Sequence, residues 1–390
     1  MRKFSDISVN KSSGVDQAAE DNNSGTAVYI HWPYCLSKCP YCDFNSHVRP
    51  IFDEENWLKK IVTEINSYPA DLKISSIFFG GGTPSLMSPQ STAIIIDTIN
   101  KHFTCSSETE VTLEANPNSS ESDRFKDFKN AGVNRISIGV QSFDQKQLQF
   151  LGRKHNTNEA AQAITNAQKY FDRVSFDLIY ALPNQTLEQW EEMLAYALSF
   201  GTTHLSLYQL TIEPETPFET RYKRKEFDIP LDDASAQFYE QTVAQMTATH
   251  MPPYEVSNFA KKGQSCRHNL SYWHYADYIG VGPGAHGRFI RQNQKIHTVN
   301  QRAPETWLLQ DRPKENRISE TDQAFERLMM GLRLYGGIMK APLEPFLNQQ
   351  ALLDLTAEGF LLPHPVRLVP TLRGILCHGS IVNYLLNDLT

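Results

Sequence analysis

Apolar residues follow two spacings that alternate from one segment of the chain to the next. Within residues 52–68, Trp57, Leu58, Ile61 and Ile65 recur every three or four positions, which is the spacing of one helix face. Shorter apolar runs lie between such segments and have the length and composition of buried strands. The expected strands are residues 26–31, 74–79, 110–115, 135–140, 173–180, 204–210 and 254–256, and the expected helices are residues 52–68, 89–103, 122–131, 157–170, 187–200 and 231–249.

This alternation of strand and helix predicts an α/β fold for most of the chain. Strands separated by helical segments form βαβ units, and successive units place their strands in parallel. We therefore expect one domain over residues 26–300, with a parallel sheet curled into a full or partial barrel of the (βα)6 kind. In such a fold the loops that follow the strands meet at one edge and carry the chemistry.

The pattern changes beyond about residue 301. Helices followed by a short hairpin predict a winged-helix-like accessory domain over residues 301–390. The first 25 residues are polar and rich in Asn and Ser, and we expect residues 1–25 to be disordered. The elements expected in the accessory domain are helices at 322–334, 343–348, 350–358 and 371–389 and hairpin strands at 359–362 and 367–369.

Charge and composition narrow the classes of partner. The net charge of −7 argues against a surface that neutralises phosphates, so we expect no nucleic-acid binding. Apolar runs are far shorter than the roughly 20 residues of a membrane span. The basic run at residues 221–225 is typical of a solvated loop and leaves a peripheral membrane contact open. The residues after Met1 lack the apolar segment of a signal peptide, so the expected location is the cytoplasm.

The strongest chemical signal is a CxxxCxxC group, Cys35, Cys39 and Cys42, which follows the first expected strand. A disulfide is disfavoured in a reducing cytoplasm. A zinc site would need a fourth ligand, which Asp43 or His47 could supply, although neither has a common zinc spacing. Structural zinc and ordinary iron–sulfur centres use four protein ligands, so three thiols favour a cluster with one iron left open.

Polar residues recur where the expected strands end, and the carboxyl ends of parallel strands share one edge of a sheet. Simpler roles remain open, since a glycine triplet can form a tight turn and polar groups can be hydrogen-bonded core residues. Glu114 would be costly in an apolar strand unless it bound a cation or an ammonium group. The residues are Gly80, Gly81, Gly82, Thr83 and Pro84 after the second strand, Glu114 and Asn116 at the third, Gln141 at the fourth, Asp177 in the fifth, and Tyr208 and Gln209 near the end of the sixth.

Five segments together resemble the radical S-adenosylmethionine (SAM) superfamily. More narrowly, the chain is similar to the oxygen-independent coproporphyrinogen III oxidase family and, within it, to a branch of haem chaperones. The likeness extends from about Ala27 to the C-terminus. The segments are YIHWPYCLSKCPYC at residues 29–42, GGGTP at 80–84, EANP at 114–117, GVQSF at 139–143 and DLIYALP at 177–183.

The resemblance implies a [4Fe–4S] cluster held by Cys35, Cys39 and Cys42, with SAM chelating the open iron. It places Tyr29 beside the cluster, at a catalytic position. The resemblance further implies SAM contacts from Gly81, Gly82 and Thr83 at the methionine end, from Glu114 at an amino or ribose group, from Gln141, Arg153 and Asp177 around the nucleoside and the carboxylate, and from His286 in a turn that approaches adenine.

One position separates the two branches of this family. The oxidases carry a further cysteine two places after the third one, and this chain has Phe44 there. The chaperone branch carries an HNxxYW motif, which is present at residues 268–273. The resemblance makes His268 the expected axial ligand of haem, since imidazole is the usual ligand of haem iron. The alternative ligands are Cys266, His274 and His286.

The resemblance implies a haem chaperone that binds haem and delivers it to a membrane-bound respiratory haem protein. It would act as a monomer or as a cluster-dependent dimer. The alternative is an oxygen-independent coproporphyrinogen III oxidase, which performs radical oxidative decarboxylation in porphyrin biosynthesis. A third hypothesis keeps the cluster and SAM but assigns another radical substrate.

Overall fold

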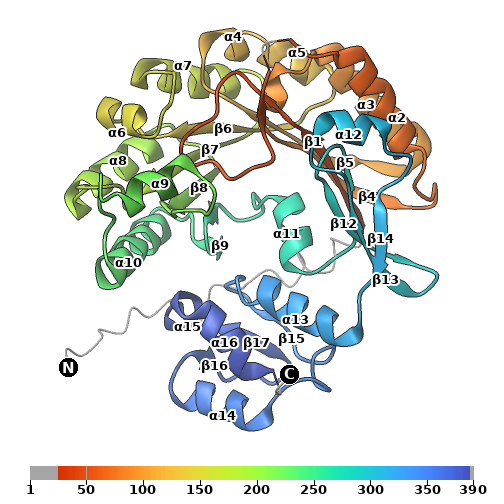
Figure 1. The fold of residues 1–390 in the computed structure, drawn as a ribbon. Coiled ribbons are helices and arrows are strands. Elements are labelled where there is room, and N and C mark those ends of the chain that lie inside the picture. The colour runs from red at the N-terminus through yellow and green to blue at the C-terminus, as the bar shows by residue number, and fades with distance from the viewer. Residues whose placement is uncertain (1–24, 50, 387–390) are drawn as a thin grey trace.

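The computed structural model describes residues 25–49 and 51–386, so the expected disorder of residues 1–25 concerns a segment that lies almost wholly outside this range. Its main feature is a strongly curved 12-stranded sheet (Figure 1). Neighbouring strands in its middle run parallel, which confirms the expected α/β partial barrel. In sheet order these parallel strands are β11 (Tyr278–Val281), β1 (Thr26–Trp32), β4 (Lys73–Gly81), β5 (Thr104–Ala115), β6 (Arg135–Gln141), β7 (Arg173–Tyr180) and β8 (His204–Gln209).

Helices cover the convex face of the sheet (Figure 1). Side-chain caps fix where several of them begin: Asp53 accepts the N–H of Asn56, and Asn156 and Glu159 form a capping box. The single helix expected at residues 122–131 is instead two short helices. The helices up to residue 248 are α2 (Glu54–Ile65), α3 (Pro89–His102), α4 (Ser119–Ser122), α5 (Phe125–Asn130), α6 (Gln145–Phe150), α7 (Thr157–Gln168), α8 (Leu187–Ser199), α9 (Pro217–Lys223) and α10 (Asp232–Ala248), with a short 3-10 turn at Pro84–Leu86.

Side chains alternate across the parallel strands, and the two faces of the sheet differ in polarity. Ile77, Phe79, Leu113 and Ile136 point toward the helices and are fully buried in the main core. The residues between them point to the concave face, where polar side chains gather. The candidate functional side chains of the strands therefore lie on this face. The polar residues of the concave face are Ser76, Glu110, Thr112, Glu114, Arg135, Ser137, Ser175, Asp177, His204 and Ser206.

Antiparallel strands extend the sheet at both ends. The expected strand near residue 254 is present as β9, whereas the sequence pattern did not predict the five strands β10–β14, which include the parallel strand β11. The division expected at residue 300 falls just before helix α12, whose Trp307 packs fully buried in the main core. The added elements are β9 (Pro253–Glu255), β10 (Asn258–Ala260), β12 (His286–Arg291), β13 (Gln294–Val299), α12 (Pro304–Leu309) and β14 (Lys314–Arg317).

The C-terminal residues form helices around a three-stranded sheet with a hydrophobic core of their own. The helix expected at 343–348 is instead a series of turns. The helix expected at 371–389 is broken at Cys377. The elements are α13 (Glu320–Gly331), β15 (Ile338–Met339), α14 (Gln349–Ala357), β16 (Leu361–Leu362), β17 (Arg367–Pro370), α15 (Leu372–Leu376) and α16 (His378–Leu385).

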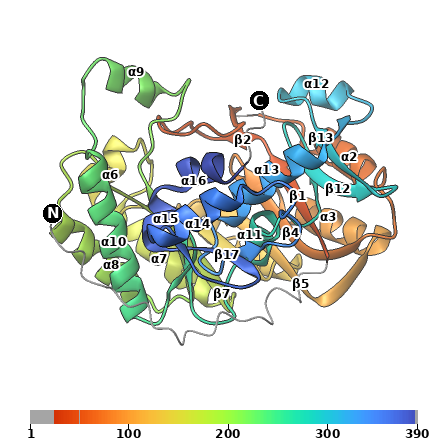
Figure 2. The ribbon, with the colours of Figure 1, turned by 90° about the horizontal axis from the view of Figure 1, so that it is seen from below.

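The C-terminal unit lies beneath the concave side of the sheet, next to helix α11 (Arg267–Trp273), as Figures 1 and 2 show from two directions. Arg288 of β12 binds Glu326 of α13 across this junction, with 2.9 Å between nitrogen and oxygen. The guanidinium of Arg333 lies 4.6 Å from the ring centre of Trp273. Across the described residues, no helix has both the length and the apolar character needed to cross a membrane.

Candidate functional site

The three cysteines lie on one loop at the carboxyl edge of the sheet. Cys35 ends the short strand β2 (Tyr34–Cys35), which pairs with β3 (His47–Val48). The glycine run after β4 packs against this loop: a side chain at Gly82 would lie 2.6 Å from the carbonyl oxygen of Tyr34. The Thr83 hydroxyl lies 3.4 Å from Cys35 Sγ. The structure therefore brings the predicted cysteines and the predicted glycine run together.

Burial affects the pKa of two of the three thiols. Burial raises the pKa of the Cys35 and Cys42 thiols, and Cys39 adds to the effect at both positions. The guanidinium of Arg153 lies 3.5 Å from Cys39 Sγ. Among the described residues, no three His, Cys, Asp or Glu side chains are gathered as closely as a metal ion requires. The donor set itself, three thiols and an adjacent cation, fits an anionic cluster with three cysteine ligands.

Arg153 connects the thiol loop to the ends of β5 and β6. Its guanidinium donates to the side-chain oxygen of Asn116 at 2.7 Å and to the carbonyl of Gly139 at 2.6 Å. Gln141, at the end of β6, has a φ of 71°, an unfavourable value for a residue with a side chain. The structure thus gathers the predicted residues of three strand ends around one loop.

Glu114 and Asp177 lie on the concave face, where they are partly buried. Burial, followed by repulsion from Asp177, raises the pKa of Glu114 to about 8. Burial raises the pKa of Asp177 to about 6, against the opposing hydrogen bonds of Ser206 and Ser137. Burial and Glu114 also raise the pKa of Tyr29, whose hydroxyl lies 3.1 Å from Nδ1 of His31. Two carboxyl groups that resist ionisation together would favour a bound cation.

His268 lies apart from the thiols, near the amino ends of the strands. It is 1% exposed and stacks on Phe78 with 4.9 Å between ring centres. Its Nδ1 is 3.0 Å from the hydroxyl of Ser76 and its Nε2 is 2.8 Å from that of Tyr272. Burial lowers the pKa of His268 to about 3, so the ring is neutral. Because both ring nitrogens are engaged, His268 could bind iron only after one of these bonds breaks.

The alternative ligands lie in different surroundings. Cys266 is fully buried, and its thiol donates to Glu110 across 3.4 Å. His274 ends helix α11 and is partly exposed. His286 is exposed at the start of β12, where its Nδ1 lies 3.2 Å from Nε2 of His297.

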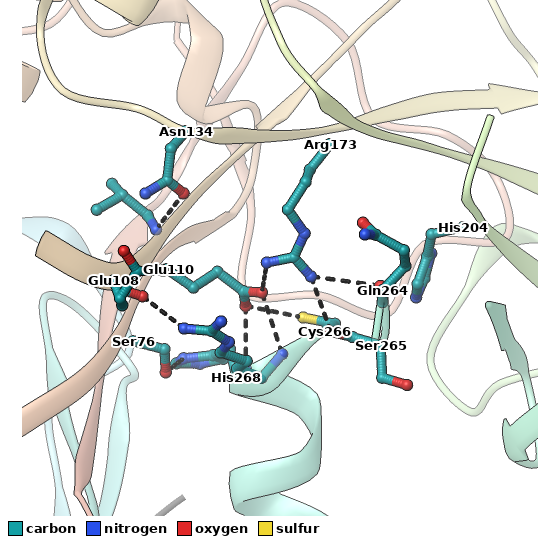
Figure 3. A network of polar contacts seen from close by, with 12 residues as sticks. Ser76, Glu108, Glu110, Asn134, Arg173, His204, Gln264, Ser265, Cys266 and His268 are labelled. Atoms are coloured by element: carbon teal, nitrogen blue, oxygen red, sulfur yellow. Dashed lines mark hydrogen bonds and ion pairs between the residues drawn. The ribbon is translucent and has the colours of Figure 1, made fainter. Parts of the chain in front are cut away.

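Glu110 organises a buried polar network that the sequence reasoning missed (Figure 3). Its carboxylate accepts from the guanidinium of Arg173 at 2.6 Å and from the backbone N–H groups of Arg267 and His268 at 3.1 Å. Buried Arg135 and partly buried Arg173 hold the pKa of Glu110 below its usual range in spite of the burial of the carboxyl. Glu110 precedes Glu114 by four positions on the same strand face, and this spacing was the available signal.

A curved parallel sheet with a three-thiol loop at its carboxyl edge defines a radical SAM type of protein. The family model described as the Radical SAM superfamily matches residues 29–197, and the HemN C-terminal domain model matches residues 318–377. The solved coproporphyrinogen III oxidase (HemN) from Escherichia coli has a TM-score of 0.78 with 20% identity, over 94% of this chain and 92% of that chain.

Curated relatives identify the family within the radical SAM class. The heme chaperone HemW of Escherichia coli is 38% identical over 86% of this chain and 91% of its own length. The mitochondrial radical S-adenosyl methionine domain-containing protein 1 of Bos taurus is 37% identical over 88% of this chain and 80% of its own length. The chain belongs to the HemW-type family of radical SAM proteins.

Glu110→Gln should lower the free energy of unfolding by about 3–5 kcal/mol, because it leaves buried Arg135 and partly buried Arg173 without their counter-charge. Urea unfolding followed by circular dichroism measures the change. Glu108→Gln, an exposed carboxyl two residues earlier on the same strand, should change stability by less than about 0.5 kcal/mol. Equal stability of the two variants would contradict a supporting role for Glu110.

Glu114→Gln should stabilise the protein at pH 8 and leave it nearly unchanged at pH 4. The folded-state pKa of Glu114, about 8, is above the ordinary value, so native stability falls as pH rises through the window between the two values. Gln does not titrate, and the gain at pH 8 should be about 2–4 kcal/mol. Melting temperatures across pH 4–9 test this, with exposed Glu192→Gln as the control. A gain that is independent of pH would refute the argument.

Proposed function

We propose that this protein is a haem chaperone that binds haem and passes it to respiratory haem proteins. The observation that carries the proposal is the 38% identity with heme chaperone HemW, which extends over 86% of this chain. The HNxxYW residues, typical of that branch, form helix α11 between the sheet and the C-terminal unit. Phe44 stands 59% exposed where the oxidases have a cysteine.

We further propose that Cys35, Cys39 and Cys42 hold a [4Fe–4S] cluster and that SAM binds beside it. When bound, the cluster supplies single electrons to SAM. The guanidinium of Arg153, 3.5 Å from Cys39 Sγ, would offset the negative charge of the thiolates. Phe44 and Leu36 are both exposed on this loop. Once a partner or ligand covers them, these two side chains would limit the access of water to the cluster.

The remaining polar residues of the carboxyl edge are proposed to hold SAM. Gly81 has a φ of 111°, and a side chain there would lie 2.6 Å from the His31 ring, so only backbone atoms would face the methionine end. Glu114 and Asp177 would pair with the positive groups of SAM, which relieves their mutual repulsion. Tyr29, Thr83, Gln141 and Arg153 complete the proposed pocket.

A second candidate is oxygen-independent coproporphyrinogen III oxidase. The fold favours it, since HemN has the same architecture over nearly the whole chain. Phe44 disfavours it, because a benzyl side chain cannot act as a thiol. Action on another radical substrate is the third possibility and requires cleavage of SAM under reduction.

We propose a reducing compartment, the cytoplasm, as the location, since all six cysteines are free thiols. The proposed recipient of haem is a membrane-bound respiratory haem protein. The basic segment at 221–225 offers a peripheral contact with a membrane: Lys223, Arg224 and Lys225 are exposed there, whereas Arg221 lies against Phe218. The oligomeric state proposed is a monomer or a cluster-dependent dimer.

Cys39→Ala should abolish the broad visible absorbance of the anaerobically reconstituted cluster and reduce bound iron to background. Cys377→Ala removes an exposed thiol outside the loop and should leave both signals at the wild-type level. Iron and sulfide analysis of both variants measures the effect. Equal loss in the two variants, or full retention in Cys39→Ala, would refute a cluster held by this loop.

Wild-type protein should bind about one haem per chain and should not convert coproporphyrinogen III. Haem titration by absorbance and an anaerobic turnover assay on the same preparation measure the two properties. Turnover without stable haem binding would instead favour the oxidase.

If His268 is the axial ligand, as the family motif implies, His268→Ala should weaken haem binding. Unchanged binding in that variant would refute the assignment.

A further inference from the structure

One asparagine joins the thiol loop to the turn between β11 and β12. Asn45 lies three residues after Cys42, and its side-chain amide donates to the carbonyl oxygens of Pro283 at 3.0 Å and Arg302 at 2.8 Å. Both acceptors are carbonyl oxygens, so the group that faces them is the NH2 of the amide. Two bonds from one side chain therefore hold the end of the thiol loop against segments that lie 238 and 257 positions later in the chain.

The backbone of Asn45 continues this connection to strand β1. Nε2 of His31 lies 2.8 Å from the carbonyl oxygen of Asn45, and Nδ1 of His31 lies 3.1 Å from the hydroxyl of Tyr29. A carbonyl oxygen only accepts, so Nε2 carries the proton. Burial lowers the pKa of His31 to about 4, so the ring is neutral and Nδ1 accepts from the hydroxyl of Tyr29. These contacts fix the tautomer of His31 and the direction of each bond between Tyr29 and Asn45.

Three glycines with positive φ pack against His31 and Asn45. A side chain at Gly81 would lie 2.6 Å from Cε1 of the His31 ring, and one at Gly282 would lie 2.6 Å from the carbonyl oxygen of His31. At Gly284, a side chain would lie 2.5 Å from Nδ2 of Asn45. The glycine run after β4 and the turn after β11 can therefore approach these two residues only because neither carries a side chain at the contact.

The turn at residues 281–285 also has hydrogen bonds that report on whether it is closed. The N–H of Gly282 donates to the carboxyl of buried Glu64 at 3.3 Å. The N–H of Gly284 donates to the carbonyl of Gln301 at 2.8 Å. Exchange of these two amide hydrogens with solvent requires the turn to open, so their exchange rates measure how firmly it is held.

We propose that Asn45 is a positioning residue that couples the thiol loop to the turn at 281–285. Ligation of a cluster by the cysteines would fix the loop, and Asn45 would carry that order to the turn, which the family resemblance places near adenine. The nucleoside side of the SAM site would thus reach its binding geometry only when the cluster is in place. This inference rests on the proposed function, because it concerns how two parts of the proposed SAM site are arranged.

Hydrogen exchange of the full-length, cluster-free protein tests the coupling directly. Asn45→Asp keeps the shape of the side chain but has no N–H to donate, so exchange at Gly282 and Gly284 should become about tenfold faster. Gly284→Ala should displace the amide of Asn45 and speed exchange in the thiol loop, where the N–H of His47 donates to Pro33 at 2.7 Å. Circular dichroism establishes that each variant is folded. Effects confined to the mutated segment in both variants would overturn the coupling.

Gly263→Ala is the matched control for the glycine variant. Gly263 has the same φ as Gly284, 75°, but a side chain there would meet no atom of the described residues within 4 Å. Backbone strain is therefore similar in the two variants, and only the collision with Asn45 differs. Exchange in the thiol loop should match wild type in Gly263→Ala. Equally fast exchange in both variants would mean that strain alone explains the effect, and the role of Asn45 would be lost.

Anaerobic reconstitution tests the consequence for ligand binding. In wild type the cluster should slow exchange at Gly282 and Gly284 about threefold, whereas in Asn45→Asp it should slow exchange only within the thiol loop. SAM titration without a reductant, which avoids cleavage, should give a dissociation constant about tenfold higher in Asn45→Asp and in Gly284→Ala at equal iron and sulfide content. A turn that still responds to the cluster in both variants, with unchanged SAM affinity, would overturn the inference.

The outcomes keep this inference apart from the proposed function. If wild type holds a cluster but neither variant alters the turn, Asn45 loses its role and the proposed cluster site stands. If wild type takes up no cluster, the proposed cluster fails. Exchange in the cluster-free protein still decides whether Asn45 joins the loop to the turn.

Discussion

The buried carboxylate of Glu110 is the group that joins strands β5 and β7 to helix α11. It joins strand β5 to Arg173 of β7 and caps the first N–H groups of helix α11, three elements that are far apart in the sequence. A buried charge of this kind is tolerated only when every lone pair has a partner, and here a guanidinium and two backbone groups supply them. Helix α11 is thereby fixed across the concave face, and its Trp273 reaches the guanidinium of Arg333 in the C-terminal unit.

The same concave face carries the opposite arrangement at its carboxyl edge. Glu114 and Asp177 are both partly buried, and burial raises the pKa of each carboxyl in spite of the opposing charge of Arg135. Apolar contacts on the convex face, such as those of Ile77 and Leu113, supply the stability that the repulsion between the two carboxyls removes. The charge of Glu110 is thus paired within the protein. Glu114 and Asp177 repel each other, and they lie toward the edge of the sheet that carries the thiols.

The sequence predicted six of the seven parallel strands and most of their covering helices, because two spacings distinguish strands from helices, but it missed β11 and the short helices α6 and α9. The helix spacing of Trp57 and Ile61 and the apolar run through Phe79 both reappear as buried core. Strand β14 was not predictable in this way, since its four residues are all exposed. The thiol loop was predictable from spacing alone. The Ser76–His268 contact was not, because the two residues are separated by 192 positions and only the fold brings them together.

His268 shows that a residue of a recognisable sequence motif can have a structural role. His268 belongs to a recognisable pattern, yet its ring is neutral, buried and bonded at both nitrogens, and breaking either bond would leave a buried polar group without a partner. The pattern is accounted for by packing, since it fixes α11 against Ser76 and Phe78. A ligand that binds His268 would therefore first have to replace a hydrogen bond to Ser76 or to Tyr272.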